Sequence, residues 1–142
     1  MPLKFVDLAQ SLKQTFALKY SPVGFYVSTS KPAKAISFMK DGTGCIMPLI
    51  FAAARGKTVA FEAQSCGYPC SAFYLGYTDW IFPGIEHFLS NGTLLNPRCE
   101  RFIKTPAQAK CYIESLKPAQ KTEGYTIFKP LEVFNEQKNP RG

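Results

Sequence analysis

Two cysteines stand three residues before a proline, in the segments Cys45–Pro48 and Cys66–Pro69, and this pattern constrains the fold more than any other feature. Proline is favoured in the first turn of a helix, where its missing N–H costs nothing and its fixed φ suits the helix. Each proline opens a largely apolar run that ends at a glycine, the residue most often found just past a helix end. The pattern predicts two short helices, Pro48–Arg55 and Pro69–Leu75.

Periodic apolar residues predict two further helices, over Phe5–Phe16 and from Thr105 to about Leu116. The second has its apolar stripe at Ala109, Tyr112, Ile113 and Leu116. Runs of β-branched and aromatic residues predict strands near Val23, Thr58 and Tyr125. A chain of 142 residues that is 46% hydrophobic can bury one core. We therefore expect a mixed α/β fold: one compact domain over residues 1–134, in which three main helices cover a small sheet, and a polar tail over residues 135–142.

Charge and hydropathy narrow the class of protein. No apolar run reaches the length of a membrane span, and the first residues lack the basic and apolar regions of a signal peptide. These features predict a cytoplasmic protein without membrane contacts. The formal net charge is +7, but the nine Lys and Arg residues from Arg98 onward are spaced singly among glutamates, and no nucleic-acid-binding motif accompanies the charge. The pattern argues against nucleic acid as a partner.

The five cysteines carry the main functional prediction. An odd number of thiols in the reducing cytosol argues against a disulfide framework. The positive end of a helix lowers the pKa of a thiol, and Cys45, Cys66 and Cys70 all stand at predicted helix starts. Cys99, between two arginines, is the candidate fourth ligand, although a substrate or exogenous ligand could take that position. The preferred function is therefore a cysteine-liganded iron–sulfur or other metal-binding protein, accessory to redox metabolism.

Other roles for these cysteines stay open on sequence alone. Buried cysteine often packs as a small hydrophobe. Zinc is another candidate metal, although two Cys-x-x-Cys pairs are absent. Cys70 could act alone as a redox thiol or nucleophile, but the only histidine, His87, comes with no second catalytic signal. Cys111 falls opposite the apolar stripe of its helix and is not assigned to the site. Whether the protein is an enzyme is left open.

An alternative function rests on aromatic residues around the second C-x-x-P segment: Tyr68, Phe73, Tyr74, Tyr77 and Trp80. Aromatic side chains of this kind line binding pockets as well as ordinary cores. The alternative prediction is a cofactor-free module that binds a small molecule or a partner in an aromatic-lined pocket.

Five segments in a fixed order span most of the chain: Leu18–Val23, Cys45–Gly56, Cys70–Tyr77, Arg101–Pro106 and Phe128–Glu132. This order resembles the family called domain of unknown function 169, an archaeal and bacterial family without an established activity. The resemblance implies a prokaryotic protein with cysteines where Cys45 and Cys70 stand. Members tend to have Gly-Gly where this chain has Ser71-Ala72. They also continue into a second α/β half with a further cysteine, so the resemblance implies that the chain completes the site as a homo-oligomer or with a second subunit. A redox partner is a separate expectation.

Overall fold

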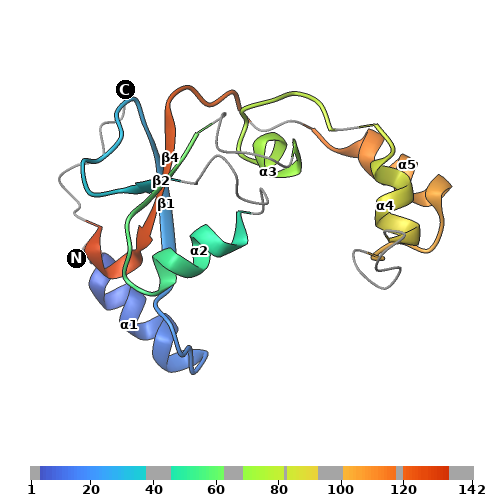
Figure 1. Cartoon of the computed structure of the whole chain (residues 1–142). Helices are drawn as coiled ribbons and strands as arrows, with labels where there is room; N and C mark the ends of the chain where they lie inside the picture. Colours follow the sequence, from blue (N-terminus) through green and yellow to red (C-terminus); the bar gives the residue numbers. More distant parts are fainter. Residues whose placement is uncertain are drawn as a thin grey trace.

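The computed structural model describes residues 4–37, 46–62, 69–81, 83–92, 101–117 and 120–134. Its centre is a four-stranded mixed sheet with the order β1-β4-β3-β2 (Figure 1). The strands are β1 (Val23–Ser28), β2 (Ile36–Ser37), β3 (Val59–Phe61) and β4 (Tyr125–Pro130). β4 pairs antiparallel with β1 and β3, and β2 pairs parallel with β3. The mixed α/β fold predicted from the sequence is therefore confirmed, with β2 as an additional short strand.

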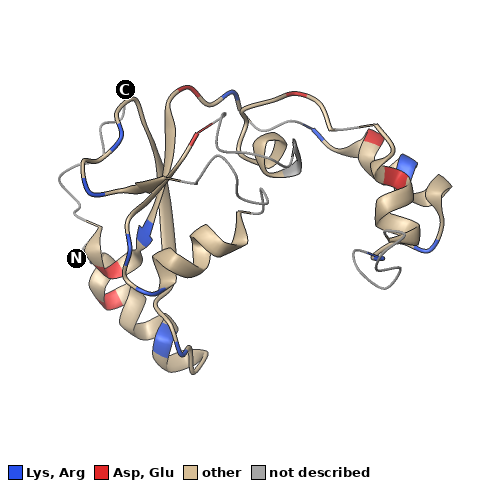
Figure 2. Ribbon diagram, in the orientation of Figure 1, with Lys and Arg blue, Asp and Glu red and all other residues tan. Residues whose placement is uncertain are grey.

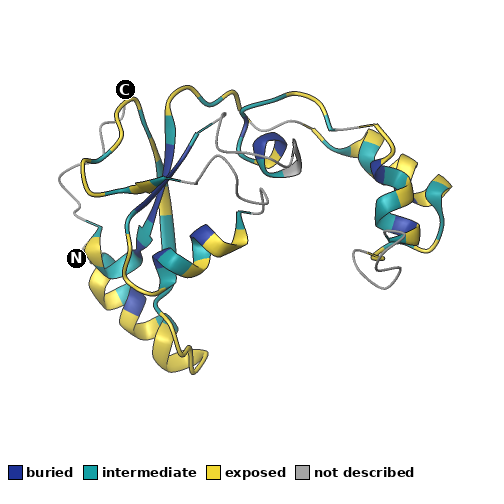
Figure 3. Cartoon of the chain, in the orientation of Figure 1, coloured by how far each residue is buried: buried dark blue, intermediate teal, exposed yellow. Residues whose placement is uncertain are grey.

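One face of the sheet is covered by α2 (Met47–Ala54). The buried core on this face consists of Leu49, Ala53, Val59, Phe61 and Phe128. The register explains this cluster, because Val59 lies opposite Phe128 and both side chains therefore point to the same face. Figure 3 shows buried residues in the central strands and on α2, with further buried residues on α3 and within the α4–α5 pair.

The other face is covered near β1 by the segment that follows β4. There the 3₁₀ turn η2 (Leu131–Val133) packs against α1 (Phe5–Thr15). Phe134 lies 5.6 Å from the ring of Phe5 and 5.9 Å from the ring of Tyr26. A Cβ at Gly24 would lie 2.7 Å from the Phe134 ring, so only glycine admits this packing. The predicted first helix ends one residue early, and Phe16, which lies beyond it, is 65% exposed.

The helices begin and end close to the prolines and glycines that predicted them. α2 begins one residue before Pro48, and α3 (Pro69–Tyr74) begins at its proline. Gly56 and Gly76, which follow these helices, have φ of +98° and +78°, values that favour glycine. α5 (Pro106–Ser115) is capped by Thr105, whose hydroxyl accepts a 3.2 Å hydrogen bond from the N–H of Gln108. These helix predictions are confirmed to within a residue.

A pair of helices, α4 (Ile85–Asn91) and α5, lies beyond α3, on the side away from the sheet (Figure 1). The two helices pack chiefly on each other. The N–H groups of Phe102 and Ile103 both donate to the carbonyl of Leu89, at 2.9 and 3.1 Å, and so hold the segment before α5 against α4. The predicted polar tail over residues 135–142 lies outside the described residues. In the described part of the chain, no helix combines the length and apolar character that crossing a membrane requires.

Candidate functional site

An apolar cleft with a volume of about 480 Å³ lies between α3 and the α4–α5 pair. Its walls come from α3, the segment before α4, both helices of the pair, and residues 102–103. The lining residues are Tyr74, Ile81, Ile85, Phe88, Leu89, Phe102, Ile103, Tyr112, Ile113 and Leu116. Eight of these ten side chains are hydrocarbon, and the other two are tyrosines.

The sequence builds one wall of the cleft through helical spacing. On α4, Phe88 and Leu89 follow Ile85 by three and four residues and therefore share a face with it. On α5, the predicted apolar stripe divides between two environments. Ala109 is fully buried, whereas the other three residues of the stripe line the cleft. The helical pair thus directs apolar side chains toward an open space rather than into a closed core.

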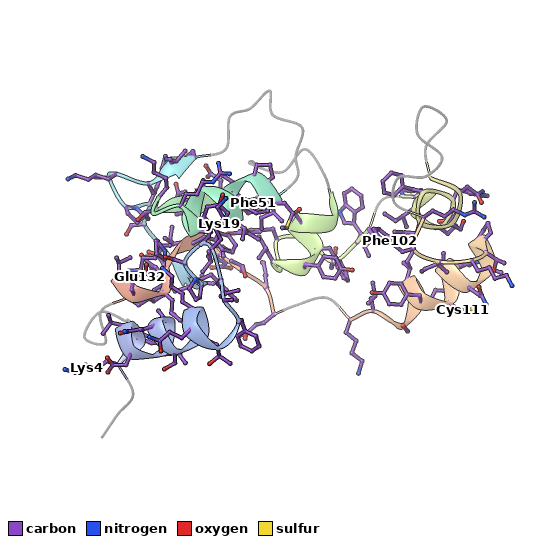
Figure 4. All side chains as sticks on the ribbon, turned by 90° about the horizontal axis from the view of Figure 1, so that it is seen from below. Lys4, Lys19, Phe51, Phe102, Cys111 and Glu132 are labelled. Carbon is purple, nitrogen blue, oxygen red and sulfur yellow. The ribbon has the colours of Figure 1, made fainter. Side chains whose placement is uncertain are left out.

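Phe102 is the lining residue most accessible to water, with 75% of its surface exposed. Figure 4 shows it on the side of the α4–α5 pair that faces α3. Tyr74 on α3 and Tyr112 on α5 are also exposed at the cleft, whereas Ile85 is buried. Covering a phenyl ring contributes about 2 kcal/mol. A ligand that covered Phe102 would gain part of this free energy.

Of the five aromatic residues proposed from the sequence, Tyr74 lines the cleft. Phe73 is buried and meets the ring of Tyr74 edge-on, at 5.7 Å between centroids. Trp80 is exposed but is not a lining residue. Tyr68 lies outside the described residues. Most of the lining of this cleft comes from α4, α5 and residues 102–103, and an aromatic pocket formed by the whole predicted set stays a prediction.

Tyr77 takes part in the core instead. Its hydroxyl donates to the carbonyl of Phe61 at 3.0 Å, and its oxygen lies 2.9 Å from the hydroxyl oxygen of Thr126. Because a phenol carries one proton, we assign Thr126 as the donor of the second bond. Burial raises the pKa of Tyr77, and the hydrogen bond to Thr126 opposes this change. Tyr77 thus links α3 to β3 and β4.

The predicted metal ligands are not tested by the structure. Cys45, Cys66 and Cys99 lie outside the described residues, and so does the side chain of Cys70, whose backbone forms part of α3. Within the described residues, no group of three or more His, Cys, Asp or Glu side chains could hold a metal ion. Cys111 is an exposed free thiol on α5, and His87 is exposed on α4.

Comparison with known protein families gives a match over most of the chain. A family model described as uncharacterised ArCR proteins, DUF169, matches residues 11–141. The chain belongs to the DUF169 family. The resemblance seen in the sequence is thus confirmed. No curated protein and no solved structure matches this DUF169 chain.

Two of the five segments that resemble DUF169 meet in the structure. The hydroxyl of Ser21 donates to Oε1 of Glu132 at 2.5 Å. Next to this bond, the N–H of Leu131 donates to the carbonyl of Pro22 at 2.8 Å. A third such segment is anchored at Gly76, whose carbonyl accepts a 2.9 Å hydrogen bond from the N–H of Thr122. In this DUF169 protein these contacts hold the sheet and α3 together and leave the cleft open.

Proposed function

We propose that this DUF169 protein is a binding module that holds an apolar small molecule in the cleft between α3 and the α4–α5 pair. The observation that carries the proposal is the cleft itself. Its volume of about 480 Å³ falls within the range of roughly 300 to 1,000 Å³ that is usual for small-molecule sites. Mostly apolar walls with a few polar groups are also typical of such sites.

The lining indicates the kind of ligand. None of the ten lining side chains carries a charge, so an ionised group in the interior of the cleft would lose hydration without gaining a partner. The tyrosines Tyr74 and Tyr112 contribute the only side-chain hydroxyls among these residues. The ligand that suits these walls has an aliphatic or aromatic body and at most a weakly polar group.

Titration with N-phenyl-1-naphthylamine, a neutral apolar dye whose fluorescence rises on leaving water, tests the proposal. The native chain is expected to bind the dye saturably. Phe102→Ala removes the most exposed lining side chain, and we expect the Kd to rise about tenfold, which corresponds to about 1.4 kcal/mol.

Phe16→Ala is the matched control, because Phe16 is 65% exposed and belongs to neither α4, α5 nor the cleft lining. It is expected to bind the dye as the native chain does. Unsaturable dye binding by the native chain, or equal loss of affinity in both variants, would contradict the proposal.

As a second function we propose the cysteine-liganded iron–sulfur or other metal site, held by Cys45, Cys66, Cys70 and Cys99 and serving a redox partner. The support is the position of the two helix starts. α2 begins two residues after Cys45, and Cys70 is the second residue of α3. Helix N-termini favour thiolates and anionic clusters. A cytoplasmic location is part of this proposal, since the reducing cytosol keeps such thiols free.

Anaerobic purification followed by absorption spectroscopy and metal analysis tests the second function. We expect iron, sulfide and a broad band at about 400 nm, as for cysteine-ligated clusters. The combined variant Cys45→Ala/Cys70→Ala should lose them, whereas Cys111→Ala should keep them, because Cys111 is an exposed thiol on α5. A colourless, metal-free native protein would rule out the cluster and leave the cleft proposal untouched.

A further inference from the structure

β1 is an edge strand whose free side can be defined bond by bond. Its register with β4 pairs Val23 with Pro130 and continues to Ser28 with Tyr125. One step before this ladder, the N–H of Leu131 donates to the carbonyl of Pro22. In an antiparallel pair, hydrogen-bonded and non-hydrogen-bonded positions alternate. Gly24, Tyr26 and Ser28 therefore bond to β4.

The remaining residues of the strand, Val23, Phe25 and Val27, direct their N–H and C=O groups toward the open edge. In the part of the chain that the structure describes, no strand pairs with this edge. The side chains of Phe25 and Val27 are 63% and 48% exposed. Both therefore combine outward-facing backbone groups with apolar surface in water.

Natural edge strands are usually protected by charges, prolines, bulges or short length. β1 has none of these: its six residues, Val23 to Ser28, contain no charged residue and no proline. Figure 2 shows the charged residues of the described chain outside this strand. An uncharged edge of ordinary strand length with exposed apolar side chains is a surface to which another strand can add.

We propose that β1 pairs antiparallel with β1 of a second copy of this chain, across a two-fold axis at Phe25. The outward-facing residues have the order Val-Phe-Val in either direction. In this register Val23 lies opposite the partner's Val27, and Phe25 lies opposite the partner's Phe25. All three outward residues then complete their backbone hydrogen bonds, and the two sheets become continuous.

The residues between the outward-facing ones also have defined partners in this register. In the same register Gly24 lies opposite the partner's Tyr26, and on this face the Phe134 ring of its own chain already covers Gly24. A two-fold interface requires a surface that fits its own copy, and β1 meets this condition in its backbone and in the order of its outward-facing residues. This self-complementarity makes a second copy, rather than a foreign strand, the partner.

Sedimentation velocity over a range of concentrations tests the pairing, with two matched variants. Val27→Lys places a charge in the interface, whereas Val6→Lys makes the same change on α1, at a residue with the same 48% exposure. The native chain and Val6→Lys are expected to dimerise, and Val27→Lys is expected to be monomeric or to dimerise at least tenfold more weakly.

Amide hydrogen exchange locates the interface. The amides of Phe25 and Val27 should exchange slowly in the dimer and rapidly in Val27→Lys, while those of Gly24 and Tyr26 stay protected by β4 and show that the sheet is intact. A native chain that is monomeric at every concentration would overturn the proposal. So would a dimer whose Phe25 and Val27 amides exchange as fast as those of the Val27→Lys monomer, or a dimer that Val27→Lys leaves unchanged.

Discussion

Ser21 and Glu132 are joined by a 2.5 Å hydrogen bond although they lie 111 residues apart in the sequence. The bond fastens the entry of β1 to η2, which follows β4. The second carboxylate oxygen of Glu132 is buried and has no hydrogen-bond partner among the described residues. Ser21 thus provides the hydroxyl that satisfies one of the two carboxylate oxygens of Glu132.

Ser21→Ala should destabilise the protein, because it leaves a part-buried carboxylate without its donor. Hydrogen bonds to charged groups contribute about 1.5 to 3 kcal/mol. We expect a loss of about 2 kcal/mol in the free energy of unfolding, measured by urea denaturation. Ser115→Ala is the control: that hydroxyl donates to the carbonyl of Tyr112 at an exposed helix end, and its loss should change stability by less than about 0.5 kcal/mol.

Tyr77→Phe should lower stability without loss of packing. The ring, 5.7 Å from that of Phe61, is retained, while the bonds to Phe61 and Thr126 are lost. Removing the hydroxyl leaves two partly buried partners unsatisfied, at a cost of about 1 to 3 kcal/mol. Thermal denaturation measures the change. Tyr20→Phe, at a tyrosine packed by the cations of Lys19 and Arg55, should leave the melting temperature nearly unchanged.

The raised pKa of Tyr77 predicts a specific alkaline transition. Because its folded pKa is higher than its unfolded pKa, the unfolded chain loses this proton first as pH rises. The contribution of the Tyr77 hydroxyl to the free energy of unfolding is fully present below about pH 10, the ordinary tyrosine pKa. It is lost as the pH rises further. Urea midpoints of the native chain should therefore fall as the pH rises above about 10. The urea midpoint of Tyr77→Phe should fall less steeply with pH. An identical slope in both proteins would show that Tyr77 does not cause the alkaline transition.

Gly76→Ala should be more damaging than Gly56→Ala, although both glycines have positive φ. A Cβ at Gly76 would collide with the carbonyl oxygen of Gln120, whereas a Cβ at Gly56 would meet nothing within 4 Å. Gly56→Ala should cost about 1 kcal/mol from backbone strain alone. Gly76→Ala should cost about 2 kcal/mol more, because the clash adds to the strain. Equal costs in chemical denaturation would show that the turn at Gly76 relaxes freely.

Features that depend on contacts between neighbouring residues were predicted from the sequence, whereas features that depend on contacts between distant segments were not. Thr105 and Pro106 set the start of α5 through contacts within one turn, and Pro48 and Pro69 mark α2 and α3 in the same way. These signals need no knowledge of the rest of the chain. β2 was missed because two residues, Ile36 and Ser37, carry no periodic pattern and are defined by pairing with β3.

The cleft was harder to predict for the same reason. Tyr74 and Phe73 are neighbours with similar chemistry, yet one lines the cleft and the other is buried. Only tertiary packing decides between them. The spacing of Ile85, Phe88 and Leu89 was the available signal for the cleft, because it forms an apolar face on a helix too short to close a core alone.

The α4–α5 pair has a thermodynamic consequence for any molecule that enters the cleft. Helices of 7 and 10 residues are marginal by themselves, and this pair presents its apolar side to the cleft. An occupant would supply the missing hydrophobic contacts and so act as a folding cofactor for this part of the chain. Local unfolding of the pair and release of the occupant would then be one linked equilibrium.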